Sequence, residues 1–145
     1  AVDMHCIFPR YKGKFDALLS THYAAAVILH DRELTLGQFE PGRYDDPALR
    51  KFAAENVDVT IDPALTGVQA IVEAQTTDGR TLAMRCDHPR GSAENPLTRA
   101  QIEAKFRGLT AEFLGAKQVN AVLDGLWKLE QLDDVASIPP QFVID

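Results

Sequence analysis

The sequence predicts an α+β fold, in which a small, mostly antiparallel sheet carries helices on one side. Three observations lead to this class. Helical spacing of apolar residues begins at Phe15, a β-hairpin pattern occupies residues 68–86, and two further helical patterns follow residue 98. Strands and helices that occur together without strict alternation are typical of α+β domains.

The composition is that of an ordinary globular protein, with 145 residues, of which 46% are hydrophobic and 25% charged. The net charge is −6 and the basic residues are scattered among acidic ones, so we expect no nucleic acid or anionic membrane as a partner. Residues 23–29, the longest apolar run, are too few to span a bilayer, and no signal-peptide pattern opens the chain. These features favour a cytoplasmic protein, in which Cys6 and Cys86 would be buried thiols.

The first part of the chain predicts a strand, a helix and a second helix. Residues 2–8 alternate weakly and stop at Pro9, which indicates a short strand whose partners would precede this sequence. Residues 15–30 have the spacing of one helix, and beyond Tyr23 it is apolar on all sides, as in a helix buried on most faces. Asp46 and Pro47 fit the cap and first position of a helix over residues 47–56.

The middle of the chain predicts a strand and a hairpin. Val57, Val59 and Ile61 alternate as a strand would. Two runs then alternate around Asp78-Gly79, a pair that suits the positive φ angles of a tight turn. One face of this hairpin is apolar: Val68, Ala70, Val72, Ala74, Leu82, Met84 and Cys86.

The last third predicts a loop and two helices. Residues 88–97 lack periodicity, and Thr98 with Gln101 forms a capping-box pattern before a helix that we expect to end at Gly115. A final helix over residues 119–129 precedes an irregular tail. We therefore divide the chain into an α+β domain, residues 1–97, and C-terminal helices, residues 98–145, which would belong to a separate helical domain.

Tyr23 and His22 are the first candidates for chemistry. A tyrosine can donate a proton or hold an oxyanion, and a histidine can act as a general acid or base. Neighbouring residues on a helix point about 100° apart, so the two would not easily grip one small ligand. The alternative is a structural pair, with a buried tyrosine whose hydroxyl is satisfied and a structural histidine.

Arg90 and Ser92 are the second candidates, in the loop that begins at His88. Arginine binds carboxylates through two hydrogen bonds, and a loop after a hairpin is a plausible place for substrate contacts. The alternative is a solvated connection. Asp3, His5 and Cys6 lack the second cluster that a metal site would need, so no metal is expected.

Three stretches, in order along the chain, resemble the C-terminal region of the MmgE/PrpD family. The first runs from Gly13-Lys14-Phe15 through Ser20-Thr21-His22-Tyr23-Ala24 to Phe39 and the Asp46-Pro47 helix start. It resembles the family's "KFS-x-x-Y-x-x-A" helix, a segment ending in Phe and a "dP-x-v" helix start, although Asp16–Leu19 stand between Phe15 and Ser20. The second is the hairpin with its Asp78-Gly79 turn. The third and most specific is Arg90-Gly91-Ser92-Ala93-Glu94-Asn95-Pro96-Leu97-Thr98 with Glu103-Ala104-Lys105-Phe106, which is similar to "G-s-x-x-n-P-l-s … e-x-K-F".

The resemblance implies that residues 1–97 are a lid-like domain and that residues 98–145 return towards an N-terminal helical domain that this sequence lacks. It also implies a homodimer that acts on small polycarboxylates without a metal or organic cofactor. Tyr23 matches the tyrosine of the S-x-x-Y helix and would reach the substrate pocket, while the resemblance gives no role to His22.

The implied function is that of a lyase fragment, a dehydratase or decarboxylase for a compound such as 2-methylcitrate or cis-aconitate, in propionate-type metabolism. Alternatives are an epimerase or isomerase of the same family and a non-catalytic binding or assembly module that keeps only the lid fold, because a shared fold does not determine the reaction. We expect the isolated chain to be inactive, because a lone tyrosine, with a pKa near ~10, is a poor base at neutral pH.

Overall fold

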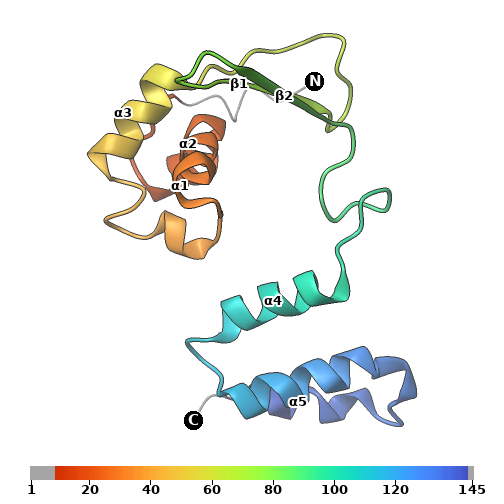
Figure 1. The fold of residues 1–145 in the computed structure, drawn as a ribbon. Helices are drawn as coiled ribbons and strands as arrows, with labels where there is room; N and C mark the ends of the chain where they lie inside the picture. The colour runs from red at the N-terminus through yellow and green to blue at the C-terminus, as the bar shows by residue number, and fades with distance from the viewer. Residues whose placement is uncertain (1–8, 144–145) are drawn as a thin grey trace. The chain divides into compact units, whose positions relative to one another are not determined.

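The chain forms two compact units, Ala1–Asp87 and His88–Asp145, in a computed structural model that describes residues 9–143 (Figure 1). The α+β class is confirmed, because helices accompany one antiparallel pair of strands. The strand expected over residues 2–8 lies outside the described residues, as do Asp3, His5 and Cys6.

The described residues of the first unit, 9–87, form four helical segments and a hairpin. Its elements are α1 (Lys14–Leu18), α2 (Thr21–Asp31), the 3-10 helix η2 (Leu36–Phe39), α3 (Pro47–Asn56), β1 (Ala70–Gln75) and β2 (Thr81–Cys86). Its core lies where α1, α2, η2 and α3 meet. The buried cluster comprises Tyr11, Ala17, Tyr23, Ala26, Val27, Phe39, Leu49 and Ala53.

The prediction of a single helix over residues 15–30 is wrong, because Ser20 separates α1 from α2. Ser20 has an extended backbone, and its Oγ accepts a hydrogen bond from the Tyr23 N–H at 3.1 Å. A serine in this position satisfies one of the backbone donors that every helix start leaves without a partner. The apolar spacing continues across the boundary and conceals it in the sequence.

The start of α3 agrees with the sequence, whereas the segment after it does not. Asp46 Oδ1 accepts the Ala48 N–H at 2.7 Å, and Pro47 occupies the first helical position, as expected. Residues 57–61 are not a strand, because among the described residues only β1 and β2 pair with each other. Alternation alone does not make a strand when no neighbouring backbone provides its hydrogen bonds.

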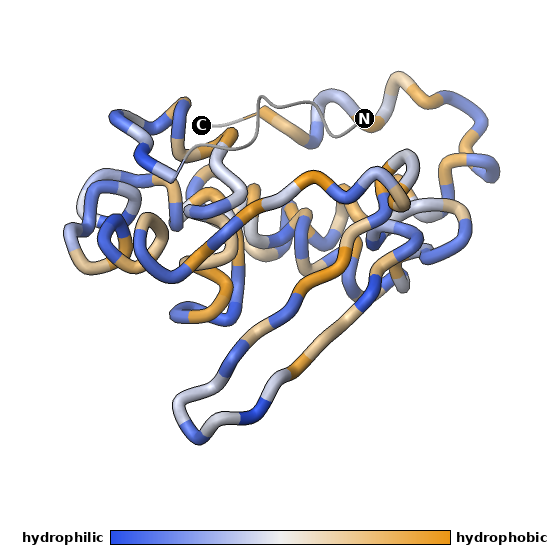
Figure 2. The backbone as a smooth tube through the Cα atoms, turned by 90° about the horizontal axis from the view of Figure 1, so that it is seen from above, coloured by the Kyte–Doolittle hydropathy of each residue, from blue (hydrophilic) through white to orange (hydrophobic). Residues whose placement is uncertain are grey.

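The predicted hairpin is confirmed, with Ala70 opposite Cys86 and Gln75 opposite Thr81. Figure 2 shows that both strands carry stretches of apolar residues, with hydrophilic residues nearer the turn. The loop is wider than a two-residue turn, because the Thr76 N–H donates to the Arg80 carbonyl at 2.9 Å and only Gly79, with φ of 85°, has a positive φ.

The apolar face of the hairpin is largely exposed. Val72 and Met84, which pair across the strands, keep 65% and 74% of their surface accessible. Cys86 is exposed as well, so the expectation of a buried thiol is wrong for this cysteine. A two-stranded hairpin has too little surface to bury one of its own faces.

The second unit consists of helices and short 3-10 turns. These are α4 (Arg99–Thr110), α5 (Ala116–Trp127), η3 (Leu129–Gln131), η4 (Val135–Ser137) and η5 (Pro139–Phe142). The capping box at Thr98 is confirmed, since its Oγ1 accepts the Gln101 N–H and Gln101 Oε1 accepts the Thr98 N–H. Gly115 does not end α4, which stops at Thr110, but caps the start of α5.

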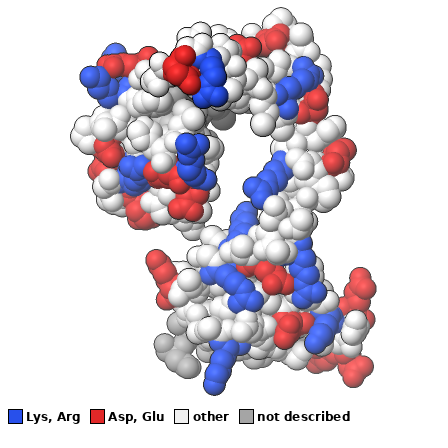
Figure 3. Space-filling view, viewed as in Figure 1, with Lys and Arg blue, Asp and Glu red and all other residues white. Residues whose placement is uncertain are grey.

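A small apolar cluster holds this second unit together. Phe106 of α4 packs against buried Leu114, Val119 and Leu123. On the face shown in Figure 3, basic and acidic side chains are interspersed on the surface of each unit. In residues 9–143, no helix has both the length and the apolar character that crossing a membrane requires.

Candidate functional site

Tyr23 lies at the centre of the first unit, in the first turn of α2. Its side chain is 0% exposed, and its ring packs edge-on against two aromatic neighbours, Tyr11 and Phe39, at centroid distances of 4.9 and 5.7 Å. The Ser20 cap determines where α2 begins and therefore which residue occupies this position. The local sequence Ser20-x-x-Tyr23 thus places a phenol inside the aromatic core.

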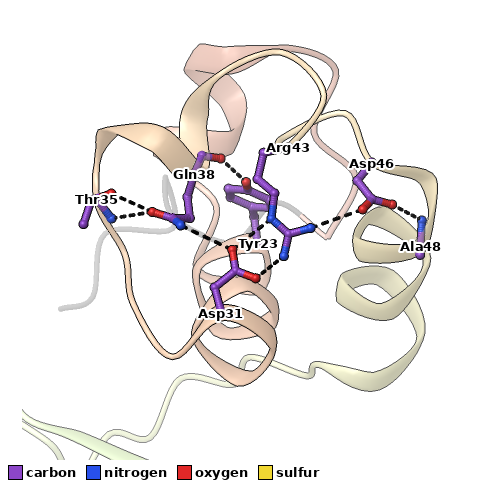
Figure 4. A network of polar contacts seen from close by, with 7 residues as sticks. All are labelled: Tyr23, Asp31, Thr35, Gln38, Arg43, Asp46 and Ala48. Atoms are coloured by element: carbon purple, nitrogen blue, oxygen red, sulfur yellow. Dashed lines mark hydrogen bonds and ion pairs between the residues drawn. The ribbon is translucent and has the colours of Figure 1, made fainter. Parts of the chain in front are cut away.

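The Tyr23 hydroxyl belongs to a polar network (Figure 4). It donates a short hydrogen bond to the backbone carbonyl of Gln38 in η2. The Gln38 side chain in turn accepts from the Thr35 N–H at 2.8 Å and donates to Asp31 Oδ2 at 3.3 Å. The network therefore links the start of α2 to its end through η2.

Arg43 closes the network on its other side. Its guanidinium makes a bidentate ion pair with Asp31, in which Nε lies 2.8 Å from Oδ2. The third guanidinium nitrogen, Nη1, donates to Asp46 Oδ2 at 3.2 Å, so Arg43 also ties the cap of α3 to the end of α2. A bidentate arginine–carboxylate pair has well-defined geometry, which suits it to hold two helix ends in register.

The electrostatics of the network favour a neutral tyrosine and a charged ion pair. Burial raises the pKa of Tyr23 to about 12, assisted by Tyr11, while the positive charge of Arg43 opposes the shift. The hydrogen bond from Arg43 lowers the pKa of Asp31, and the same contact raises the pKa of Arg43. At neutral pH, the Tyr23 hydroxyl is therefore a hydrogen-bond donor and not a base.

His22 is also buried, with 3% of its surface exposed, but it stays outside this network. Its Nδ1 has no hydrogen-bond partner among the described residues. Burial lowers the pKa of His22, and the negative charge of Asp58 partly opposes this shift. A buried imidazole with an unsatisfied nitrogen is neutral near pH 7.

Arg90 and Ser92 belong to the second unit, in the loop that precedes α4. Gly91, with φ of 94°, turns the chain, and its N–H donates to the Asn95 carbonyl at 2.7 Å. Ser92 Oγ accepts the Asn95 N–H at 3.2 Å, whereas the Arg90 side chain is exposed. Ser92 thus helps to order its own loop, and His22 and Tyr23 are in the other unit.

Sequence reasoning missed the residues that surround Tyr23 and those beside Tyr11. Gln38, Asp31 and Arg43 come from three separate segments, and no local motif joins them. Arg50, whose guanidinium lies over the Tyr11 ring at 5.1 Å, is on α3. The one available signal was the capping-box spacing of Thr35 and Gln38, which marks η2. Within residues 9–143, no group of three or more potential ligands is placed to hold a metal ion.

Comparison with models of known protein families agrees with the sequence motifs. The sequence has no match among curated proteins. The family model for the MmgE/PrpD C-terminal domain matches residues 5–129, which include α2 with Tyr23, the hairpin and the Arg90–Thr98 loop. Since this match covers most of the chain, the protein belongs to the MmgE/PrpD family and carries its C-terminal domain.

Proposed function

We propose that this chain is the C-terminal part of an MmgE/PrpD-type lyase, a cytoplasmic dehydratase or decarboxylase for a small polycarboxylate such as 2-methylcitrate or cis-aconitate. The observation that carries the proposal is the family match over residues 5–129. Dehydration and decarboxylation next to a carboxylate both require that carboxylate groups be held while a proton is moved. The proposed partner for this task is the helical domain with which the family begins.

Tyr23 is the proposed hydrogen-bond donor of the active site. With a pKa raised to about 12, it holds its proton at neutral pH and can stabilise negative charge on a substrate oxygen. Its hydroxyl is already oriented by the aromatic cluster and by the Gln38 carbonyl. To act, it would have to exchange that carbonyl for a substrate oxygen, which a displacement of η2 would allow.

The general base must come from elsewhere in this proposal. Tyr23 holds its proton too firmly to be one, and His22 is buried on the helix with an unsatisfied nitrogen. We therefore place the base in the helical domain of the family. Arg90 and Ser92 remain proposed carboxylate contacts, because Arg90 is exposed and Ser92 orders the loop that carries it.

The test compares the 145-residue chain alone with a protein that also contains the family's helical domain. Each is incubated with 2-methylcitrate, cis-aconitate and an optically active dicarboxylate, while alkene absorbance, carbon dioxide and optical rotation are followed. We expect turnover only when the helical domain is present, by loss of water or carbon dioxide. Loss of optical rotation alone would instead identify the epimerase alternative.

Two tyrosine variants then test the role of Tyr23. Tyr23→Phe should lower kcat by about 10²–10³, as expected for loss of a preorganised donor. Tyr44→Phe is the matched control, because Tyr44 packs against the same core and is half-buried. An unchanged kcat for Tyr23→Phe, measured at a temperature where the variant is folded, would contradict the proposed role.

A non-catalytic binding or assembly module is the second candidate, and one observation favours it. The Tyr23 hydroxyl is fully buried and already has a partner in the Gln38 carbonyl, as in a structural tyrosine. In this case no substrate would turn over in either protein, and Tyr23→Phe would alter only stability.

A further inference from the structure

The first unit contains a cavity of about 190 Å³ beside the aromatic cluster. Its lining consists of Pro9, Arg10, Tyr11 and Arg50, which bring the segment before α1 next to α3. The space is large enough for several water molecules or for a small organic anion. Nothing in the Tyr23 network occupies it, because that hydroxyl is bound to the Gln38 carbonyl.

Two buried donors beside this cavity lack partners of good geometry. Tyr11 is 5% exposed, and a side-chain hydrogen bond from Arg50 acts on its hydroxyl to lower its pKa, although the contact does not reach normal hydrogen-bond geometry among residues 9–143. Arg50 Nε is buried in the same way and is also unpaired within the described part of the chain. Buried polar groups usually have a hydrogen-bond partner of good geometry, so the poorly satisfied Tyr11 hydroxyl and Arg50 Nε could both donate to an acceptor in this cavity.

The Arg50 guanidinium is held in place rather than free to move away. One of its terminal nitrogens donates to the Lys12 carbonyl at 3.2 Å, and its Cζ lies 5.1 Å from the centroid of the Tyr11 ring. The Tyr11 ring itself rests edge-on against Tyr23. The donors are therefore preorganised, which reduces the entropy that a ligand would lose on binding.

The charge of the lining selects an anion. Arg10 and Arg50 line the cavity, and neither forms an ion pair with a carboxylate in residues 9–143. Asp46 and Asp45 are the acidic residues among residues 9–143 whose charges raise the pKa of Tyr11. Asp46 is occupied by Arg43 and by the cap of α3, and Asp45 accepts the Gly42 N–H at 2.6 Å.

We propose that this cavity is a binding site for a small carboxylate, with the Tyr11 hydroxyl, Arg50 Nε and Arg10 as its donors. An arginine has no acceptor, so its ligand must supply oxygen lone pairs, and the planar guanidinium matches a carboxylate. Pro9 and the Tyr11 ring offer apolar surface for a short carbon chain. Burial raises the pKa of Tyr11, although Arg50 opposes the shift, so this hydroxyl keeps its proton at neutral pH. The site does not depend on any catalytic role of Tyr23.

The test is a titration of the ¹⁵N-labelled 145-residue chain, followed by NMR at the backbone amides and the arginine Nε–Hε groups. Tricarballylate is the probe, its neutral triamide controls for shape, and inorganic phosphate controls for charge. We expect saturable shifts at Arg50 Nε–Hε and at the Tyr11 amide, with a dissociation constant on the order of 1 mM. The triamide should cause none of these shifts, and phosphate should bind more weakly than tricarballylate.

Three arginine variants locate the site. Arg50→Gln and Arg10→Gln should each weaken binding by about tenfold, the effect of one lost charged hydrogen bond. Arg32→Gln removes the same charge from an exposed arginine of the first unit and should change binding by less than about twofold. Arg10 is exposed, so Arg10→Gln should leave the fold intact and tests whether the carboxylate binds at this cavity even if Arg50→Gln disturbs the fold.

Several outcomes would overturn the proposal. An absence of saturable shifts would mean that the cavity holds only solvent. If Arg32→Gln weakened tricarballylate binding as much as the other two variants, binding would depend only on the net charge of the chain. Tighter binding of phosphate than of tricarballylate would make it a phosphate site and refute the carboxylate assignment.

Discussion

Removal of the Tyr23 hydroxyl is the most informative single change, because the structure separates its effect on stability from its effect on catalysis. Tyr23→Phe keeps the ring contacts with Tyr11 and Phe39 and deletes only the donor to the Gln38 carbonyl. Gln38 is 8% exposed, so its carbonyl would stay buried with one donor fewer. Leaving a buried acceptor unsatisfied costs about 1–3 kcal/mol.

Amide hydrogen exchange under native conditions measures this loss where it occurs. The amides of α2, which carries Tyr23 and the fully buried Val27, should exchange faster by the factor that corresponds to about 1–3 kcal/mol. In a thermal melt, each kcal/mol should lower the Tm of a unit of this size by about 4–8 °C. The single tryptophan, Trp127, lies in the other unit, so its fluorescence does not report on this region.

Tyr44→Phe provides the comparison for stability as well. Tyr44 packs against the same cluster, and its hydroxyl makes no hydrogen bond among the described residues, so the expected change is within about 0.5 kcal/mol. If the two variants were equally stable, the Tyr23 hydrogen bond to the Gln38 carbonyl in Figure 4 would contribute nothing to stability.

Three further predictions test other parts of the two units. Burial lowers the pKa of folded His22 below its unfolded value of about 6.5, so the unfolded chain takes up the proton first as the pH falls. The stability that is present above this pH is therefore lost below it, by at most about 1.4 kcal/mol per pH unit. His22→Leu should flatten the fall in Tm as the pH drops below about 6.5, and a slope equal to that of the unsubstituted chain would refute this account. Leu49→Ala should destabilise the first unit by about 2–5 kcal/mol in urea unfolding followed by circular dichroism, because Leu49 is 1% exposed in the core, and a loss below about 1 kcal/mol would mean that the core is loosely packed. Thr98→Ala should cost about 0.5–2 kcal/mol through loss of the α4 cap, measured by Trp127 fluorescence in urea, and an unchanged midpoint would show that this cap is dispensable.

Local sequence determined the features that depend on neighbouring residues alone. Asp46 with Pro47 and Thr98 with Gln101 predicted two helix starts correctly, because each cap closes its hydrogen bonds within three residues. The hairpin was predictable for a similar reason, since its two strands are joined by a short loop that contains Gly79. The ordered motifs were also sufficient to indicate the family that the match over residues 5–129 then confirmed.

Other features depended on contacts that no local pattern encodes. Residues 57–61 alternate like a strand, yet they find no partner, since a strand exists only where another backbone pairs with it. The serine at position 20 could have been an interior residue of one long helix, and its role as a cap became evident only from the separate packing of α1 and α2.

The candidate sites show the same division. The sequence by itself singled out Tyr23, because its motif is local. Only the tertiary structure showed that its hydroxyl is bound to the Gln38 carbonyl and that Asp31 and Arg43 complete the network. The cavity beside Tyr11 likewise brings together Pro9–Tyr11 and Arg50, which are about forty residues apart in the chain. Long-range packing creates such neighbours, because burial of a shared apolar core, and not any adjacent motif, decides which distant side chains meet.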